Sequence, residues 1–357
     1  MKTLRRYVAT EITVATALVI AALVMLFAFF DLVEQIKDLG RGAYTIRRIL
    51  LYVLLSVPDH VYALFPVAAL IGTLFALAQL VAGSEYTVMR TSGVSTARFA
   101  ATLALIGSLF ASASFVIGEF VAPAAEQLAQ RVRSQSITGL VAQEFRSGLW
   151  IKDDTSFINV VEVLPDTTLR GVRIYDFDKD YRLRSISYAR RGAYQSDRHW
   201  LLQEVVQTRF DDMKSSVHEI AEMRWQSVLE PDLINVLLVK PEQMSAWNLY
   251  SYTQHLKENR QKALRYEIAL WTKLTYPLAV VVMMVLALPF AYFQGRQAGV
   301  GAKIFAGIML GIVFHFLNRL FSHLGLLNDW PPAVSALMPT LTFLAIATGM
   351  MWWQERR

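Results

Sequence analysis

The sequence predicts a helical membrane protein that carries one inserted all-β domain, a sandwich or jelly roll, outside the lipid. Six apolar stretches are each long enough to cross a bilayer. A polar segment of roughly 140 residues separates the first three stretches from the last three, and short alternating runs fill that segment. The expected domains are therefore residues 1–123 with three spans, residues 124–265 outside the lipid, and residues 266–357 with three further spans.

Each apolar stretch meets the length requirement of a membrane helix. About 20 mostly apolar residues are needed, because the hydrocarbon core is roughly 30 Å thick and a helix rises 1.5 Å per residue. The first stretch follows basic residues, as a secretory signal does, but it is longer than a signal core and lacks a small-residue cleavage site, so we expect it to be retained. The stretches are residues 12–30, 61–82, 99–122, 274–293, 304–321 and 333–353.

Basic residues in the short loops predict the orientation. With the N-terminus inside, nine Lys and Arg residues lie on the cytoplasmic side and four on the opposite side, which places both termini in the cytoplasm. The cytoplasmic set is Lys2, Arg5, Arg6, Arg90, Arg98, Arg296, Lys303, Arg356 and Arg357, and the opposite set is Lys37, Arg41, Arg47 and Arg48. The central segment balances 20 Lys and Arg against 19 Asp and Glu, so we expect no nucleic-acid partner.

Period-two alternation in the central segment predicts antiparallel strands. The runs are residues 156–163, 169–176, 182–188, 199–206 and 217–225. This pattern fits a plain globular cap as well as a strand-lined trough whose open edges add a partner sheet or whose interior holds acyl chains. After Pro241 a helical pattern resumes and is expected to tether the outer domain to the fourth span.

The chain lacks the motifs of catalysis and cofactor binding. The nearest match to a phosphate loop, residues 295–303, has Val300 where glycine is required. The sequence has no HExxH, no GxSxG and no cysteine, and its six histidines are scattered. We therefore expect a non-enzymatic chain with no bound metal or cofactor, so that any ATP is hydrolysed by a separate subunit.

The loop between the second and third spans predicts a short helix on the cytoplasmic face. Ser84 is a good N-cap, Glu85 complements the positive helix start, and Gly93 follows Ser92 as a stop signal. The segment is either a mere connector or a coupling helix that docks on a cytoplasmic ATPase. The candidate coupling residues are Ser84, Glu85, Met89, Arg90 and Gly93.

Basic residues near the outer ends of the spans predict an anionic head-group site. Lys37 and Arg41 follow the first span, Arg133 lies beyond the third, and Arg319 lies near the outer end of the fifth. Charges at membrane depth are costly and usually face a cavity or a partner. An ordinary solvated helix extension and snorkelling to the interface are the competing interpretations.

Several motifs in register resemble the LptF/LptG family of lipopolysaccharide export permeases, and its LptG members in particular. The resemblance runs from Arg6 to Trp353, more loosely in the outer domain. Its carrying segments are Ser-Val-Pro at 56–58, the loop at 84–93, Gly-Glu-Phe-Val-Ala-Pro at 118–123, Gly-Leu-Trp-Ile-Lys-Asp at 148–153, and Leu-Trp-Thr-Lys at 270–273 with Pro277 and Val-Met-Met at 282–284.

The resemblance implies a permease subunit of an ABC transporter in the bacterial inner membrane, with a periplasmic β-jellyroll. Its implied partners are an LptF-type permease, a dimer of an LptB-type ATPase that binds ATP and Mg, an LptC-type bitopic protein and an LptA-type periplasmic bridge. Lys37 and Arg133 match basic family positions near the lipid phosphates, whereas Asp31 departs from a basic residue in some relatives. Phe65 and Phe314 are candidates for the walls of an apolar lipid cavity.

Two other functional classes compete with this interpretation. A membrane-anchored periplasmic scaffold or receptor would need no transport, although six spans exceed what an anchor requires. A secondary transporter should show inverted repeats and charges near the midplane, whereas Glu119, Lys273 and Arg319 lie close to span ends.

Overall fold

The computed structural model describes residues 2–136, 148–153, 155–163, 168–178, 180–196, 199–211, 214–227, 241–258, 261–293 and 300–356. Arg296 and Arg357, which were counted in the predicted orientation, lie outside these residues, as does the 294–299 part of the turn before Lys303.

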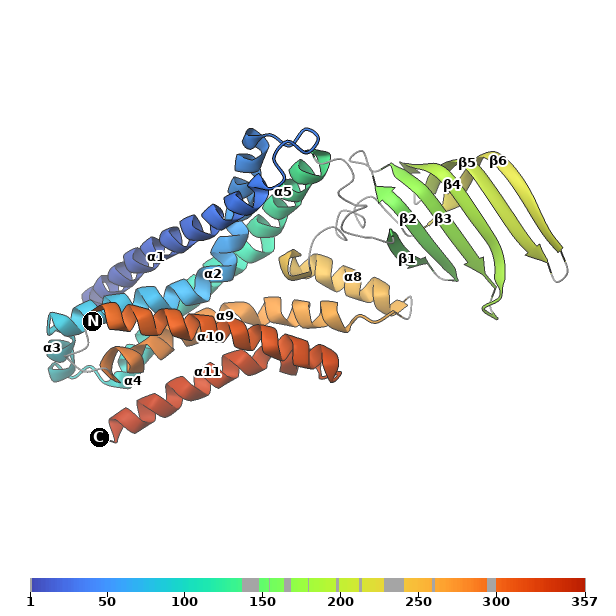
Figure 1. The fold of residues 1–357 in the computed structure, drawn as a ribbon. Coiled ribbons are helices and arrows are strands. Elements are labelled where there is room, and N and C mark those ends of the chain that lie inside the picture. Colours follow the sequence, from blue (N-terminus) through green and yellow to red (C-terminus); the bar gives the residue numbers. More distant parts are fainter. Residues whose placement is uncertain are drawn as a thin grey trace.

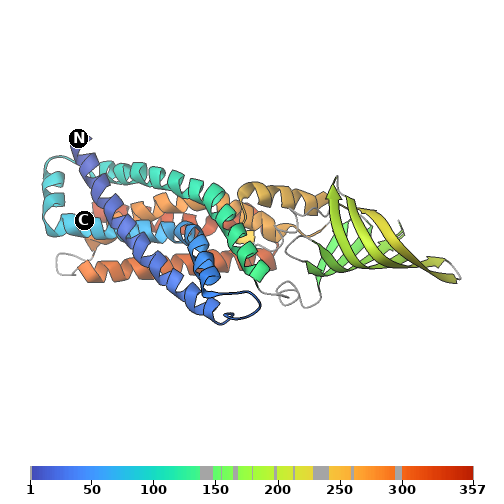
Figure 2. The same cartoon turned by 90° about the horizontal axis from the view of Figure 1, so that it is seen from above.

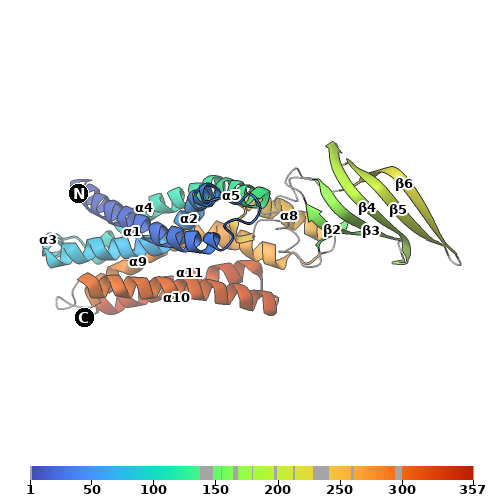
Figure 3. The ribbon, with the colours of Figure 1, turned by 45° about the horizontal axis from the view of Figure 1, so that its top comes forward.

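Six helical spans form a bundle, and all six predicted stretches are confirmed as helices long and apolar enough to cross a membrane. The two ends of the chain lie at one end of the bundle together with α3, and the sheet lies beyond the other end (Figures 1 and 3). The helices are α1 (Lys2–Ile36), α2 (Ile46–Ala82), α3 (Glu85–Thr91), α4 (Thr96–Val116), α5 (Ala122–Ser136), α8 (Ala246–Glu258), α9 (Leu264–Phe293), α10 (Val300–Leu327) and α11 (Pro332–Glu355).

The central span is α2. Its apolar window is 83% buried, whereas the windows of α1 and α10 are each 17% buried. The helical core joins residues of α1, α2, α4, α9, α10 and α11, among them Leu70, Leu103, Met283 and Phe343. Since α2 contacts α1, α9, α5 and α10, the bundle is organised around it, and α1 and α10 keep long apolar faces exposed.

The third span continues beyond the predicted boundary at residue 123. A π-helical turn, Ile117–Val121, joins α4 to α5, and the N–H of Ala122 donates to the carbonyl of Ile117, five residues earlier. The helix therefore runs on to Ser136, and in Figure 2 it extends from the bundle towards the sheet.

The inserted all-β domain is confirmed as a six-stranded antiparallel sheet. Its strands are β1 (Leu149–Asp153), β2 (Ser156–Val163), β3 (Leu169–Phe177), β4 (Leu183–Ser196), β5 (His199–Asp211) and β6 (Lys214–Gln226), paired in sequential order. One face carries a separate core that includes Ile158, Val172 and Trp200. The described strands thus form a meander, and the additional wrap that makes a jelly roll stays a prediction.

The predicted tether after Pro241 is also confirmed. A short 3-10 turn, Pro241–Gln243, leads into α8, whose buried Leu249 packs with Met244 against Tyr266 and Leu270. The return from the sheet to the fourth span is therefore a packed helical hairpin of α8 and α9 (Figure 1).

Candidate functional site

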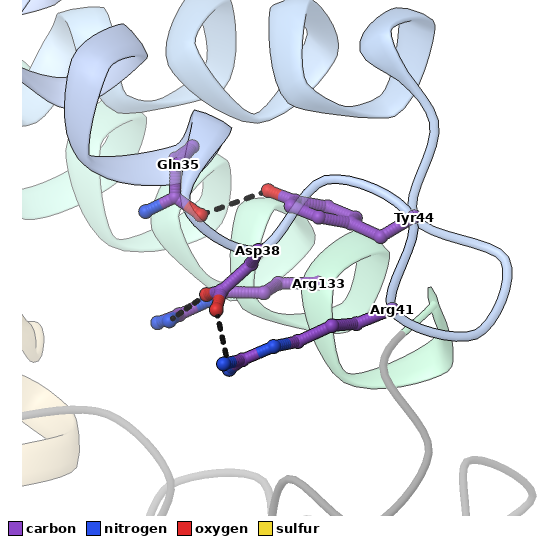
Figure 4. A network of polar contacts seen from close by, with 5 residues as sticks. All are labelled: Gln35, Asp38, Arg41, Tyr44 and Arg133. Carbon is purple, nitrogen blue, oxygen red and sulfur yellow. Dashed lines mark hydrogen bonds and ion pairs between the residues drawn. The ribbon is translucent and has the colours of Figure 1, made fainter.

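A polar network joins the end of α1 to the end of α5 on the side of the sheet. Both carboxylate oxygens of Asp38 are used: Oδ1 accepts from Arg41 at 2.7 Å, and Oδ2 accepts from Arg133 at 3.2 Å (Figure 4). Asp38 therefore brings together two predicted head-group residues that lie 92 positions apart in the sequence.

The loop between α1 and α2 is fixed around this network. The Tyr44 hydroxyl donates to the Gln35 side chain at 2.9 Å, as Figure 4 shows. The N–H of Ala43 donates to the carbonyl of Ser136, and Arg48 donates to the Ser136 hydroxyl. Burial raises the pKa of Tyr44, although the positive charge of Arg133 acts in the opposite direction. The loop is consequently fixed to the ends of both α1 and α5, which positions Arg41 and Arg133 next to Asp38.

The network keeps an excess of positive charge. The Lys37 side chain is exposed and makes no hydrogen bond or ion pair with the described part of the chain. The Arg41 side chain is 57% exposed, and the buried Nε of Arg133 has no hydrogen-bond partner among the described residues. Two arginines therefore share one carboxylate, with the exposed Lys37 next to Asp38 in the chain, and donor groups remain that an anion such as a phosphate can accept from.

Arg319 does not join this network in the described structure. It is exposed on α10, with His315 one turn away on the same helix. The sequence places Arg319 near the end of a span, and only the fold could show that α10 packs on α2 and α11.

The short helix α3 lies at the opposite end of the bundle, as predicted for the coupling candidate. Its C-terminus is a Schellman motif: Gly93 has φ +89° and donates to the carbonyl of Arg90, while Val94 donates to the carbonyl of Met89. Ser84, however, adopts a left-handed conformation with φ 59° and its side chain caps no N–H. The expectation that Ser84 acts as a side-chain N-cap is wrong, whereas Ser95 does cap α4 through the N–H of Arg98.

The coupling candidates divide into an exposed and a buried set. Met89 packs into the helical core together with Tyr86, whose ring meets Phe99 edge-on. The exposed set is Ser84, Glu85, Arg90 and Gly93, and Val88, which was not predicted, is exposed among them. Met89 therefore seats α3 on the bundle, and the exposed set forms a charged surface around an exposed valine.

Two contacts hold the exposed charges of α3. Tyr7 at the start of α1 reaches Glu85 at 3.5 Å, and Arg90 donates to the hydroxyl of Thr96 at the start of α4. A movement of α3 would consequently be transmitted to the first and the third spans through these two contacts.

The two cavity candidates lie in the packed core. Phe65 meets Phe110 edge-on with centroids 6.0 Å apart, and Phe314 meets Phe343 at 5.3 Å. Both rings are buried in the helical core, and their predicted place in the wall of a lipid cavity stays a prediction. Exposed apolar side chains lie on the outer faces of the spans, and those of α1 and α10 include Leu18, Phe29, Phe30, Phe305, Ile312 and Phe316.

The structure contains a second polar cluster that was not predicted. Lys273 is buried and donates to the carbonyl of Met244, while Glu119 accepts from the N–H groups of Ala246 and Trp247 at 2.8 and 3.3 Å. Nearby, Asp59 accepts from Gln243 at 3.2 Å. The sequence signal that could have predicted this cluster is the presence of ionisable residues within apolar spans, because such residues need polar partners when they are buried.

A further pair joins the first two spans. Asp31 of α1 lies 2.5 Å from Nε2 of His60 on α2, beside Phe27. Asp31 therefore contributes to the contact between α1 and α2.

Comparison with known proteins identifies relatives over the whole chain. The model of the family described as lipopolysaccharide export system permease LptF/LptG matches residues 6–353. The chain is 33% identical over 350 residues to lipopolysaccharide export system permease protein LptG of Escherichia coli strain K12, which covers 98% of this chain and 97% of that protein. It is 32% identical over 355 residues to LptG of Haemophilus influenzae, with 99% and 98% covered.

Proposed function

This chain belongs to the LptF/LptG family of lipopolysaccharide export permeases, and from that premise we propose how its geometry serves lipid export. It is a membrane-embedded transport subunit of the export system. The proposal concerns its partners, its orientation and the residues that contact lipid and motor.

Extraction of lipopolysaccharide needs an apolar enclosure and an energy source. Each methylene withdrawn from the bilayer costs about 0.8 kcal/mol, so a lipid with several acyl chains does not leave spontaneously. In our proposal the enclosure forms between this chain and an LptF-type permease, and the exposed apolar faces of α1 and α10 line it. Phe65 and Phe314 support these walls from the core behind them.

The energy comes, in this proposal, from a dimer of an LptB-type ATPase that carries the ATP and Mg. It docks on α3, whose exposed Glu85, Val88 and Arg90 offer a small charged surface with an apolar centre. Because Tyr7 and Thr96 contact those charges, the docked motor would move the starts of α1 and α4.

At the other end of the bundle, the cationic network holds the phosphates of the lipid while its chains move. The observation that carries the proposal is the convergence of Arg41 and Arg133 on Asp38, which the exposed Lys37 precedes in the chain. Arg319 on α10 would approach the same lipid from the opposite wall.

The orientation follows from the same arrangement. We place both termini and α3 in the cytoplasm and the sheet in the periplasm of a cell with an inner and an outer membrane, in agreement with the bias of basic residues. The sheet would then pass lipid to an LptC-type bitopic protein and an LptA-type periplasmic bridge.

Reconstitution tests this function as a whole. The full chain is incorporated into proteoliposomes with LptF-, LptB- and LptC-type partners, and lipopolysaccharide transfer to an LptA-type acceptor is followed with and without ATP. Transfer that requires both ATP and this chain is expected. ATP-independent transfer, or transfer that persists when this chain is omitted, contradicts the proposal and favours a scaffold without transport.

Glu85→Ala is expected to reduce ATP-driven transfer several-fold, because it removes a charge from the docking surface of α3. The ATPase should copurify in lower yield while thermal unfolding of the chain is unchanged, since Glu85 is exposed. Arg98→Ala is the matched control, because it also removes one exposed charge, but from the first turn of α4 and not from α3. Equal copurification and transfer in both variants would remove α3 from the motor interface.

Lys37→Glu is expected to lower photo-crosslinking of lipopolysaccharide to the end of α1, since it reverses the exposed charge next to Asp38 in the chain. Arg47→Glu is the control, because Arg47 is equally exposed but lies at the start of α2 and is not adjacent to Asp38 in the chain. Crosslinking should fall clearly more in the first variant. A similar yield in both would show that the network does not hold the phosphates.

A further inference from the structure

One face of α8 is exposed from end to end and changes character along its length. The stripe begins with Trp247 and Tyr250, which are 72% and 55% exposed and whose rings lie 6.3 Å apart. It continues through Gln254 to Glu258, both exposed. The opposite face, with Leu249, Thr253 and Leu256, is buried. The helix therefore shows two large aromatic rings at its start and polar groups at its end.

The start of α8 is tied to the membrane spans. Glu119 of the π-helical turn accepts from the N–H groups of Ala246 and Trp247, and Lys273 of α9 holds the carbonyl of Met244. The N–H of Asn248 donates to the Ser245 hydroxyl, which completes the cap. These contacts fix the position of Trp247 along the bundle axis relative to the third span and α9.

The exposed face of α9 marks where that height lies in the bilayer. Going inward, it presents Arg265, then Trp271, then the apolar Leu274 and Leu278. A change from charge through tryptophan to aliphatic side chains is typical of the boundary between head groups and acyl chains. Trp271 lies two residues before Lys273, whose amine reaches the turn that precedes Trp247. Trp247 therefore lies close to the level of Trp271.

We propose that Trp247 and Tyr250 form a lipid-contact site, in which both rings lie at the boundary between head groups and acyl chains of the leaflet on the side of the sheet. Rings with an apolar body and one polar group suit this region, where one end is dry and the other wet. Gln254 and Glu258 extend into water, one and two turns farther out. By anchoring α8 in this boundary, the site would set the depth in the membrane at which the segment between the sheet and the fourth span begins. The inference rests on the spans crossing a membrane and not on the proposed partners.

The chain contains no cysteine, so single cysteines can be labelled without background. Tyr250→Cys, Gln254→Cys and Glu258→Cys lie on one stripe, about 6 Å apart along the helix. Each full-length variant carries an environment-sensitive fluorophore in nanodiscs of phosphatidylethanolamine and phosphatidylglycerol. Quenching is measured with nitroxide lipids, labelled at the head group or at carbon five of the acyl chain, and with aqueous iodide.

Lipid quenching is expected to be strongest at position 250, weaker at 254 and absent at 258, and iodide should show the reverse order. Adding Trp247→Ser should lower lipid quenching at position 250, whereas Trp247→Tyr should preserve it. Equal iodide quenching at 250 and 258 would overturn the proposal. So would a label at 250 that neither quencher reaches once the permease complex is assembled, because the stripe would then be a protein interface.

Discussion

Replacing Gly72 by alanine is expected to force α1 away from α2 and to lower the stability of the chain by about 1–3 kcal/mol or more. A Cβ at this position would lie 2.6 Å from the Cα and the N of Thr16 and would also meet the Thr16 hydroxyl. The Thr16 backbone cannot rotate away as a flexible side chain can. Since α1 is otherwise largely exposed, this crossing holds the first span in the bundle.

Gly349→Ala is the matched control, because Gly349 also lies inside a span and a Cβ there would meet nothing within 4 Å. This variant should unfold at the same temperature or slightly higher, since alanine favours a helix over glycine by about 0.5–1 kcal/mol. Thermal unfolding of both variants in one detergent measures the difference. If Gly72→Ala is as stable as Gly349→Ala, the close crossing of α1 and α2 is not a stabilising contact.

Lys273→Met is expected to cost about 3–5 kcal/mol, the range found when one member of a buried charge pair is removed. Lys273 is 6% exposed, donates to the carbonyl of Met244 and lies 5.5 Å from the ring centroid of Tyr62. Its charge is attracted by the carboxylates of Glu119 and Asp59, and both carboxylates would lose this compensation. The start of α8 would lose one of its attachments as well.

Lys303→Met is the control that separates the loss of charge compensation from the loss of a buried lysine as such. Lys303 is also buried and also donates to a carbonyl, that of Ala291 at 2.9 Å, but no carboxylate among the described residues acts on it. Its replacement should cost only about 1–2 kcal/mol. Adding Glu119→Gln to Lys273→Met should recover part of the loss. Simple additivity of these two substitutions would contradict a coupled pair.

Local pattern was sufficient to predict most elements of the fold. The predicted run at residues 156–163 is β2, and the tether after Pro241 is α8. Both depend on side-chain periodicity, which the chain carries locally. The conformation of Ser84 depends instead on how the chain turns from α2 into α3, and a serine before a glutamate does not encode that turn.

The candidate site was predictable in part. The shared height of Lys37, Arg41 and Arg133 follows from counting residues along spans, but the role of Asp38 as a common acceptor for the two arginines required α1 and α5 to meet. Likewise, the sequence alone does not tell whether an apolar residue such as Phe65 or Phe314 faces the core or the lipid. Only helix packing decides which face becomes core, and here it placed both rings inside.

The π-helical turn at Ile117–Val121 is the part of the third span that can absorb a change in length. Such a turn accommodates one residue more than a regular helix of the same rise, so deleting one residue there would let it close into a regular helix and leave the downstream face unchanged. Deleting one residue from the regular helix of α5 before Arg133 would instead rotate Arg133 by about 100°, because a regular helix has 3.6 residues per turn. Arg133 would then be turned away from Asp38, so the same loss of one amino acid has opposite consequences in two neighbouring turns.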